Sequence, residues 1–323
     1  MKKIWFYFYN ILVLPLFKII IYILSIFKKK VREGIKGRRR LYENLIIDTA
    51  GIDRNKKIIW FHSSSMGEFE QAKPIIEQIK RNVDVNILVT FFSPSGYKNS
   101  LKYPHADIIA YLPLDSVRNA KRFVSIVKPS AVLFMRYDFW PNFIWALQRY
   151  RIPTYIVDAT MKIKSKRKLP LVKQFHKTLF KDFTKILTVS EKDKNSFKDF
   201  DIPDEKLAVV GDTRFDRVHQ KSLEAKKKNL FRDEIIKGKK ILVLGSSWEG
   251  DEEIILPAIK KLFDYMDNIL VVIAPHEPTT KRLEELEYSL GELSKIRFSY
   301  KNDYTNEKVI IIDSIGILLT LYY

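Results

Sequence analysis

An acid and three serines stand at the end of an apolar run near residue 60. Glu68 follows IIWFHSS within the segment HSSSMGEFE, where the sequence turns helical. A carboxylate in such a loop can act as a general base toward a substrate hydroxyl, and Gly67 lets a substrate approach the backbone closely. The structural alternative is a capping box, because Ser65 and Glu68 fit the spacing S-x-x-E at the start of a helix. The stretch by itself is compatible with both roles.

A second acid, Asp138, follows another apolar run. It lies in MRYDFWPN, directly before an aromatic pair and Pro141. Its carboxylate is a second candidate for chemistry on a substrate hydroxyl. The alternative is again structural, because an aromatic residue followed by proline commonly ends a strand and begins a helix with proline in its first turn.

Two loops in the last third of the chain are candidates for anion binding. GSSWEGDEE places Ser246 and Ser247 where a helix begins, and the free backbone amides and dipole of a helix start bind phosphate. APHEP places His276 and Glu277 at the end of an apolar run. His276 could contact a phosphate, although a lone histidine more often hydrogen-bonds within its own loop.

Several classes of site are excluded by what the chain lacks. It contains no cysteine, so disulfides, metal–thiolate sites and thiol nucleophiles are impossible. The histidines show no metal-binding spacing, and we predict neither a metal site nor a cofactor. The motifs GxGxxG, GxxxxGK(S/T), GxSxG and HExxH are absent, which argues against dinucleotide enzymes, P-loop NTPases, serine hydrolases and zinc proteases.

The first 40 residues are both the most apolar and the most basic part of the chain. Ile4–Phe27 is aromatic and aliphatic except for Asn10, Pro15, Lys18 and Ser25, and about 20 apolar residues suffice to span a bilayer. The interruptions favour a tilted or interfacial anchor, with the following KKKVREGIKGRRR against anionic lipid and the rest of the chain in the cytoplasm. A buried core helix is the alternative. A cleaved signal peptide is disfavoured, because no small-residue cleavage site follows.

The elements that must position the candidate residues indicate an α/β protein. Apolar runs rich in isoleucine and valine alternate with amphipathic segments, which is typical of a parallel sheet covered on both faces. Ligands of such sheets bind beyond the carboxyl ends of the strands, where the candidate residues lie. A polar, basic stretch then precedes a second series with only three strong strands. We predict a membrane anchor over 1–30, one domain over 31–206, and a second, incomplete domain over 207–323.

The formal net charge is +19, from 57 basic and 38 acidic residues in a chain of 323. Such an excess is typical of proteins that bind nucleic acid, an anionic membrane or an anionic substrate. About half of it lies beside the apolar N-terminal segment, and no nucleic-acid recognition motif is present. We therefore predict an anionic membrane surface as a partner and no nucleic acid.

Taken in order, eight segments resemble the Kdo transferases, the 3-deoxy-D-manno-octulosonic acid transferases of lipopolysaccharide synthesis. They are GRRR after the apolar segment, WFHSSSMGEFEQAKPII, TFFSPSGY, YLPLDSVRNAKRFVSIVKPSAVLFMRYDFWPN, VVGDTRFDR, GSSWEGDEEIIL, IAPHEP and VIIIDSIGILLTLY. The resemblance implies a GT-B glycosyltransferase, in which an acceptor-binding and a nucleotide-sugar-binding Rossmann-type domain face a crevice. It also implies inverting, metal-independent transfer of Kdo from CMP-Kdo to the lipid A precursor, lipid IVA, on the cytoplasmic side of the inner membrane.

The resemblance also gives the candidate residues their roles. Glu68 is similar to the acid that deprotonates the acceptor hydroxyl, and Asp138 stands where the family usually has glutamate. Stabilisation of the departing CMP phosphate would fall to Ser246, Ser247 and His276. The predicted substrate-binding set is completed by Ser65, Gly67 and Glu277.

The resemblance further predicts that the chain is shortened at its carboxyl end. Members of the family continue past the final LY with a glycine-rich strand and loop and a further helix. Two other functions stay open: a GT-B transferase that acts on another lipid or nucleotide sugar, and an inactive module that only binds the acceptor. An assay of CMP-Kdo against UDP-sugars separates the two enzyme classes.

Overall fold

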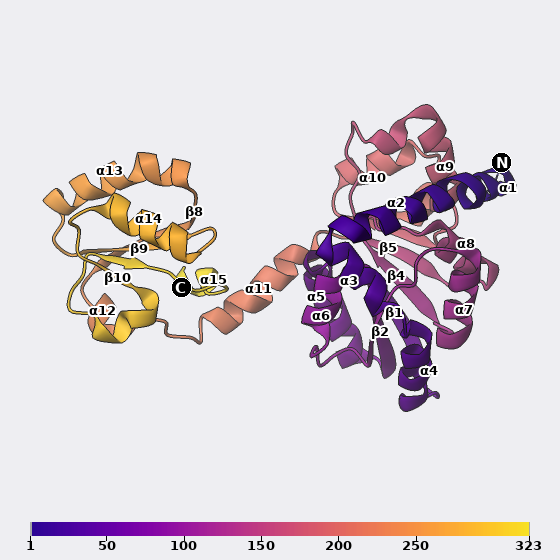
Figure 1. Ribbon diagram of the computed structural model, residues 1–323, viewed down its shortest axis with the longest axis horizontal. Helices are drawn as coiled ribbons and strands as arrows, with labels where there is room; N and C mark the ends of the chain where they lie inside the picture. Colours follow the sequence, from indigo (N-terminus) through magenta and orange to yellow (C-terminus); the bar gives the residue numbers. More distant parts are fainter. Residues whose placement is uncertain (1, 323) are drawn as a thin grey trace. The chain divides into compact units, whose positions relative to one another are not determined.

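The computed structural model describes residues 2–322 and divides into two α/β units, one ending at Arg217 and the other beginning at Val218 (Figure 1). Each unit has a parallel sheet with helices beside it. The predicted α/β class is confirmed. The division falls later than the predicted boundary at residue 207. The short strand β7 (Leu207–Val209) pairs with β6 (Lys185–Thr188) and so extends the first sheet.

The sheet of the first unit has seven strands in the order β3-β2-β1-β4-β5-β6-β7. Besides β6 and β7 they are β1 (Lys57–Ser63), β2 (Val85–Phe91), β3 (Ile108–Tyr111), β4 (Ala131–Met135) and β5 (Thr154–Ala159). The chain runs from β1 outward to β3 and then crosses back to β4, which pairs in parallel with β1. The carboxyl ends of β1 and β4 therefore flank the topological switch point, where open α/β sheets bind ligands.

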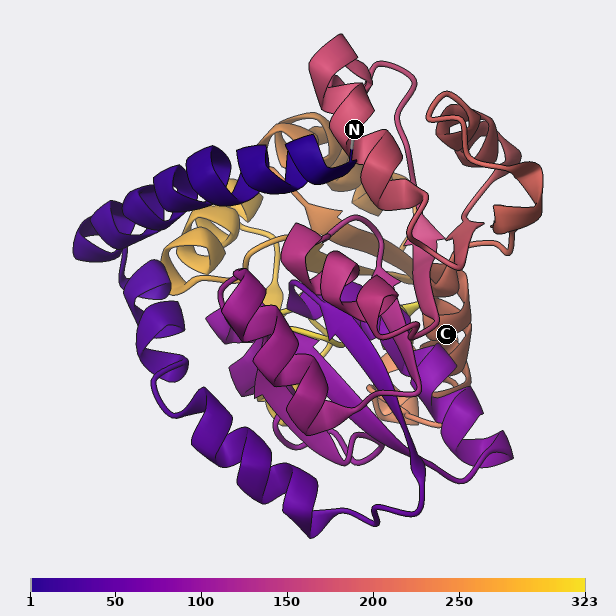
Figure 2. The same cartoon turned by 90° about the vertical axis from the view of Figure 1, so that its right-hand side faces the viewer.

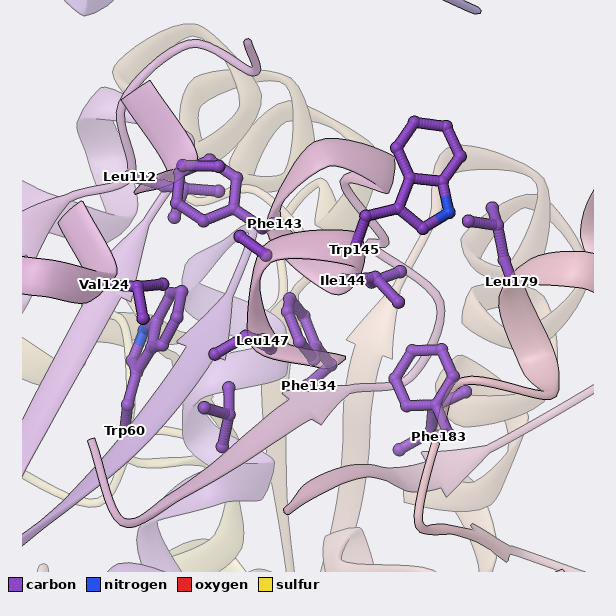
Figure 3. Packing of buried hydrophobic residues seen from close by; sticks show 14 of the residues in the cluster. Trp60, Leu112, Val124, Phe134, Phe143, Ile144, Trp145, Leu147, Leu179 and Phe183 are labelled. Atoms are coloured by element: carbon purple, nitrogen blue, oxygen red, sulfur yellow. The ribbon is translucent and has the colours of Figure 1, made fainter. Parts of the chain in front are cut away.

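Helices cover both faces of this sheet. They are α4 (Leu41–Gly51), α5 (Met66–Asn82), α6 (Pro94–Ser100), α7 (Val117–Val127), α8 (Pro141–Arg149), α9 (Pro170–Phe180) and α10 (Glu191–Lys198), with 3-10 turns at Lys166–Lys168 and Asp204–Lys206. The helix α11 (Thr213–Ala225) contains the division and connects the two units. Neighbouring residues of β1 serve opposite faces, as the alternation of strand side chains requires. Trp60 contacts the rings of Phe123 of α7 and Phe143 of α8, and Figure 3 labels Trp60 and Phe143 in this cluster. Phe61 lies in a separate cluster with Phe69 of α5.

The N-terminal segment forms one apolar helix of 26 residues, Lys2–Phe27, with a mean hydropathy of 2.3. By length and composition alone it could cross a membrane. It comprises α1 (Lys2–Phe8), a π-helical turn (Tyr9–Val13) and α2 (Leu14–Phe27). The π turn ends two residues before Pro15, whose missing N–H removes one bond of the helical ladder. The chain then bends into α3 (Lys29–Gly37) and α4 (Figure 2).

One side of this helix is attached to the first unit. The Tyr9 hydroxyl donates a hydrogen bond to Asp115 at 2.8 Å, and the Asn10 amide bonds to Asn142 of α8 at 3.1 Å. Lys2 forms an ion pair with Asp182 at 2.7 Å. The opposite side is exposed and apolar, including Ile4, Ile11, Leu12, Leu16, Ile19, Ile20, Ile23, Ile26 and Phe27. The helix is therefore not the buried core helix that the sequence left as an alternative.

Asp115 makes this attachment sensitive to pH. Burial raises the pKa of Asp115 to about 6, above its ordinary value of 3.8. The folded chain therefore prefers the protonated carboxyl, and this contribution to stability is lost as the pH rises through 6. From about pH 4 to about pH 7 we expect the free energy of unfolding to fall by up to about 3 kcal/mol through this group. Urea unfolding of wild type and Asp115→Asn across this range measures the difference, and parallel pH curves for the two proteins would contradict it.

The second unit has a four-stranded parallel sheet in the order β10-β11-β9-β8. Its strands are β8 (Lys240–Ser247), β9 (Ile269–Pro275), β10 (Lys295–Arg297) and β11 (Val309–Ile311). Its helices are α12 (Asp233–Ile236), α13 (Glu249–Tyr265), α14 (Thr280–Leu290) and α15 (Leu318–Leu321), with a 3-10 segment at Phe298–Asp303. The three strong strands predicted are β8, β9 and β11, and the edge strand β10 is additional.

Candidate active site

The two predicted acids lie at the same edge of the first sheet. Glu68 is in the first turn of α5, directly after β1, and Asp138 is in the loop between β4 and α8. Since β1 and β4 are paired, with His62 opposite Phe134, both loops leave from the switch point. The sheet thus brings two loops that are distant in the chain to one place.

The carboxylate of Glu68 is held from one side. Its Oε2 accepts hydrogen bonds from the backbone amide of Ser64 at 2.6 Å and from the Ser64 hydroxyl at 2.7 Å. The reciprocal capping box with Ser65 is not formed, because the Ser65 side chain makes no capping bond and the glutamate bonds one residue earlier. Its Oε1 has no hydrogen bond within the described residues. A methyl group built on Gly67 would meet only Ser65 Oγ at 4.0 Å, so this loop is open at the glycine.

Asp138 contacts a buried histidine. Its Oδ2 lies 2.9 Å from Nε2 of His62 and accepts a bond from the indole N–H of Trp140 at 3.2 Å. His62 is fully buried at the end of β1, whereas the Asp138 side chain is 23% exposed. Sequence reasoning assigned no role to His62 beyond excluding it as a metal ligand. The one available signal was a polar ring in an otherwise apolar strand that leads to the GE loop.

Two further residues at this edge adopt a left-handed backbone conformation that is rare outside glycine. They are Arg136, with φ 62° just after β4, and Asp158, with φ 52° in β5. Such conformations cost roughly 1–3 kcal/mol each and concentrate at functional sites. Asp158 is fully buried, accepts bonds from the amide and hydroxyl of Thr213, and has its pKa raised by burial. It ties the segment VVGDTRFDR to the sheet, a connection that sequence reasoning missed.

The apolar N-terminal helix runs beside the same edge. Phe17 of α2 contacts the ring of Trp140 at 5.8 Å, and Phe92, after β2, stacks on Trp140 at 4.7 Å. Arg38, after α3, donates to the carbonyls of Leu112 at 2.7 Å and Phe92 at 2.8 Å. This arginine belongs to the basic run predicted to face anionic lipid. Its guanidinium instead fastens the α3 turn to the loops after β2 and β3, and burial lowers the pKa of Arg38 to about 10.

The second unit brings its predicted residues together at the carboxyl end of β8 and β9. Ser246, with φ 60°, lies 2.7 Å through its hydroxyl from Nδ1 of His276. The Trp248 indole stacks on His276 with 4.2 Å between ring centroids. A cavity of about 220 Å³ beside them is lined by Ser247, Trp248, Glu249, His276, Glu277, Thr279, Lys281, Arg282 and Glu285.

Ser247 differs from its predicted role. Its hydroxyl is buried and donates to Glu252 at 2.6 Å, and Glu252 also forms an ion pair with Arg282. A serine hydroxyl committed to a buried carboxylate is not free to bind phosphate, so its part here is to connect β8 to α13. Trp248 and Arg282, which the sequence did not single out, line the cavity as well. Within residues 2–322 no cluster of three or more histidine, aspartate or glutamate side chains is placed to hold a metal.

Comparison with known proteins decides the family. Residues 34–217 match the family described as 3-Deoxy-D-manno-octulosonic-acid transferase (kdotransferase). This chain belongs to the Kdo transferase family. Its members are glycosyltransferases, which confirms both the resemblance and the enzyme class predicted from the sequence.

Individual Kdo transferases match most of this chain. The 3-deoxy-D-manno-octulosonic acid transferase of Haemophilus influenzae is 27% identical over 98% of this chain and 74% of its own length. The Rickettsia bellii enzyme of the same name is 28% identical over 84% of this chain and 63% of its own length. The chain thus spans about two thirds of the length of these relatives.

Solved structures share the fold. The UDP-GlcNAc 2-epimerase from Neisseria meningitidis aligns with a TM-score of 0.57 and 15% identity, over 82% of this chain and 74% of that one. The UDP-GlcNAc 2-epimerase from Methanocaldococcus jannaschii gives a TM-score of 0.55 and 18% identity, over 82% of this chain and 76% of that one. At such identities the likeness concerns the fold alone, and it confirms the predicted GT-B-like α/β fold.

Proposed function

We propose that this Kdo transferase moves Kdo from CMP-Kdo to the lipid A precursor, lipid IVA, at the cytoplasmic face of the inner membrane. The observation that carries the proposal is the edge between β1 and β4. Two carboxylates from neighbouring strands lie there beside a helix whose outer side is apolar and exposed. A lipid acceptor needs both a base for its hydroxyl and a site at the membrane surface.

Glu68 acts as the general base in this proposal. Its Oε2 is held by Ser64, which leaves Oε1 to take the proton from the acceptor hydroxyl. The acceptor oxygen then forms a bond to the anomeric carbon of Kdo while the bond from that carbon to the CMP phosphate oxygen breaks. A single displacement inverts the anomeric carbon, and the electron pair leaves with CMP. The bonds formed and broken in this proposed displacement account for all atoms and electrons without a metal ion or cofactor.

The second unit supplies the donor site. Ser246 and His276 place a hydroxyl and a ring nitrogen beside the cavity at the end of β8, where they would bind the CMP phosphate. Arg282 lines the same cavity while paired with Glu252, and the exposed face of the Trp248–His276 stack offers a surface for the base. Glu277 lines the same cavity and would accept a hydroxyl of the nucleotide or sugar.

The apolar helix attaches the enzyme to the membrane. Its inner side is bonded to the first unit, and its outer side would lie in the interfacial region of an anionic bilayer. Lys28, Lys29 and Lys30 follow directly and are exposed, as lysines in contact with lipid phosphates would be.

Replacement of exposed apolar residues by aspartate tests this attachment. Ile19 and Ile23 are 55% and 51% exposed. An aspartate within hydrocarbon costs about 2–3 kcal/mol, so Ile19→Asp with Ile23→Asp should weaken binding to anionic vesicles about 100-fold or more. Leu171→Asp, at an exposed position of α9, is the matched control and should bind as wild type. Vesicle co-sedimentation measures this, and equal losses in both variants would contradict the attachment.

A donor panel tests the proposed function. Membranes that contain this chain are incubated with lipid IVA and either CMP-Kdo or UDP-GlcNAc, and the mass of the lipid product is measured. A gain of one or more Kdo residues from CMP-Kdo alone supports the proposal. Transfer from UDP-GlcNAc would favour a GT-B transferase with another donor, and no transfer with a folded first unit would favour an acceptor-binding module.

A further inference from the structure

A chain of polar side chains leads from the interior of the first sheet to the candidate active site. It begins at Trp60 and passes through Thr90 of β2 and His62 to Asp138. Trp60, His62 and Thr90 are fully buried. Buried polar groups are costly unless each is hydrogen-bonded, and here every link is 2.8–2.9 Å long. The surrounding strand positions are apolar, so this row of hydrogen-bonded polar side chains stands out within the sheet.

The links favour one position of the proton on the His62 ring. The indole of Trp60 can only donate, and it donates to Oγ1 of Thr90 at 2.8 Å. The Thr90 hydroxyl must then give its own proton to another group. Nδ1 of His62 lies at 2.9 Å and the carbonyl of Phe61 at a marginal 3.5 Å, so Nδ1 is the better acceptor. The proton of a neutral imidazole is therefore on Nε2, which faces Asp138.

The carboxylate of Asp138 thus receives two N–H donors on one oxygen. Nε2 of His62 donates to Oδ2 at 2.9 Å, and the indole of Trp140 donates to the same atom at 3.2 Å. Trp140 itself contacts Phe92 and Phe17 of the apolar helix. The other oxygen, Oδ1, has no partner within the part of the chain that the structure describes. Both donors therefore orient the carboxylate so that Oδ1 is free for a substrate hydroxyl.

We propose that His62 is a positioning residue of the transferase, which holds Asp138 through Nε2–H so that Oδ1 accepts a hydroxyl of the reacting sugar. The role rests on the proposed function, since it concerns the substrate of the same site. The pairing of β1 with β4 supplies the geometry. His62 is the next-to-last residue of β1 and lies opposite Phe134 of β4, four residues before Asp138. From this position the ring of His62 reaches the carboxylate of Asp138, whose side chain is one methylene shorter than that of a glutamate.

His62→Phe and His62→Gln test the role. Phenylalanine keeps the volume and removes the donor, whereas the side-chain amide of glutamine can replace Nε2–H. In His62→Phe we expect kcat for Kdo transfer to fall by up to about 100-fold, the loss that a displacement of about 1 Å in a reacting group produces. KM should change little, and His62→Gln should recover most of the rate. Val132→Ala, a buried change in β4, controls for loss of stability.

Two results would overturn the role. One is a folded His62→Phe protein with the kcat of wild type, and the other is His62→Gln as slow as His62→Phe at equal stability. If wild type transfers no sugar from any donor, the proposed function fails, and the geometry is still tested by the ¹⁵N resonances of the His62 ring. A proton on Nε2 whose signal shifts in Asp138→Asn supports the placement. A proton on Nδ1 alone overturns it.

Discussion

Glu68→Gln is expected to slow Kdo transfer by at least about 100-fold without unfolding the protein. Glutamine has the same shape, and its carbonyl oxygen can still accept the amide and hydroxyl bonds of Ser64, so the turn into α5 is retained. What is lost is the basic oxygen. General base catalysis typically contributes about 10²–10⁴-fold, so kcat should fall by at least about 100-fold. The measurement is the initial rate of Kdo transfer to lipid IVA at saturating CMP-Kdo.

A matched variant separates this effect from a change in surface charge. Glu43→Gln removes one negative charge from an exposed residue of α4, on a different helix from Glu68. It should leave kcat unchanged. A Glu68→Gln enzyme with the rate of Glu43→Gln would show that Glu68 only fixes the loop.

Asp138→Asn is expected to have the second largest effect. The amide oxygen can still accept from His62 and Trp140, but the amide NH₂ then occupies the place of Oδ1 and cannot accept a substrate hydroxyl. Loss of a charge-assisted hydrogen bond costs about 1.5–3 kcal/mol, which corresponds to a fall in kcat/KM of roughly 10- to 150-fold. The steady-state kinetics of purified enzyme in detergent measure it.

The opposite amide rotamer provides the internal check. If the side-chain amide of the Asp138→Asn enzyme rotated to present its oxygen to the substrate, its NH₂ group would face the N–H groups of His62 and Trp140, which is unfavourable. The Asp138→Asn enzyme should therefore not recover activity at any pH. Wild-type kcat/KM in this variant would contradict a role for Oδ1.

The sequence predicted the α/β fold because the long strands are continuous apolar runs. In β2 all seven residues are buried, and such runs between amphipathic helices indicate a covered parallel sheet. The three-residue strands β7 and β10 were missed, whereas β11, which is equally short, was predicted because it lies in the apolar run VIII. The missing β7 also explains the displaced boundary. The short edge strand β7 is identified by its hydrogen bonds to β6 and not by a pattern in its own sequence.

The sequence singled out individual residues of the candidate site, but not the contacts between them. Glu68 and Asp138 stood out because an acid follows each strand. Their neighbours His62 and Thr90 are ordinary strand residues in the sequence, and only the register of β1 against β2 and β4 brings them into a chain. Ser247 shows the reverse: the sequence places it in a phosphate-binding loop, whereas its partner Glu252 lies in the first turns of the following helix and binds its hydroxyl.

One property of the N-terminal helix was predictable from the sequence, and another was not. Its apolar composition predicted attachment to a membrane, and its exposed outer side is consistent with that expectation. Its contact with Trp140 depends on tertiary structure and was not predictable from composition. Because Trp140 also bonds to Asp138, the apolar N-terminal helix and the candidate acid share one neighbour.

The anomeric configuration of the product tests the central claim most directly. Wild-type enzyme is supplied with CMP-Kdo and lipid IVA, and the configuration of the new Kdo linkage is determined by NMR and compared with that of the donor. A single displacement assisted by Glu68 predicts a Kdo-bearing lipid with the inverted configuration, and no such product from Glu68→Gln. A product with the retained configuration, or equal product from both enzymes, would contradict the assignment of Glu68 as the base.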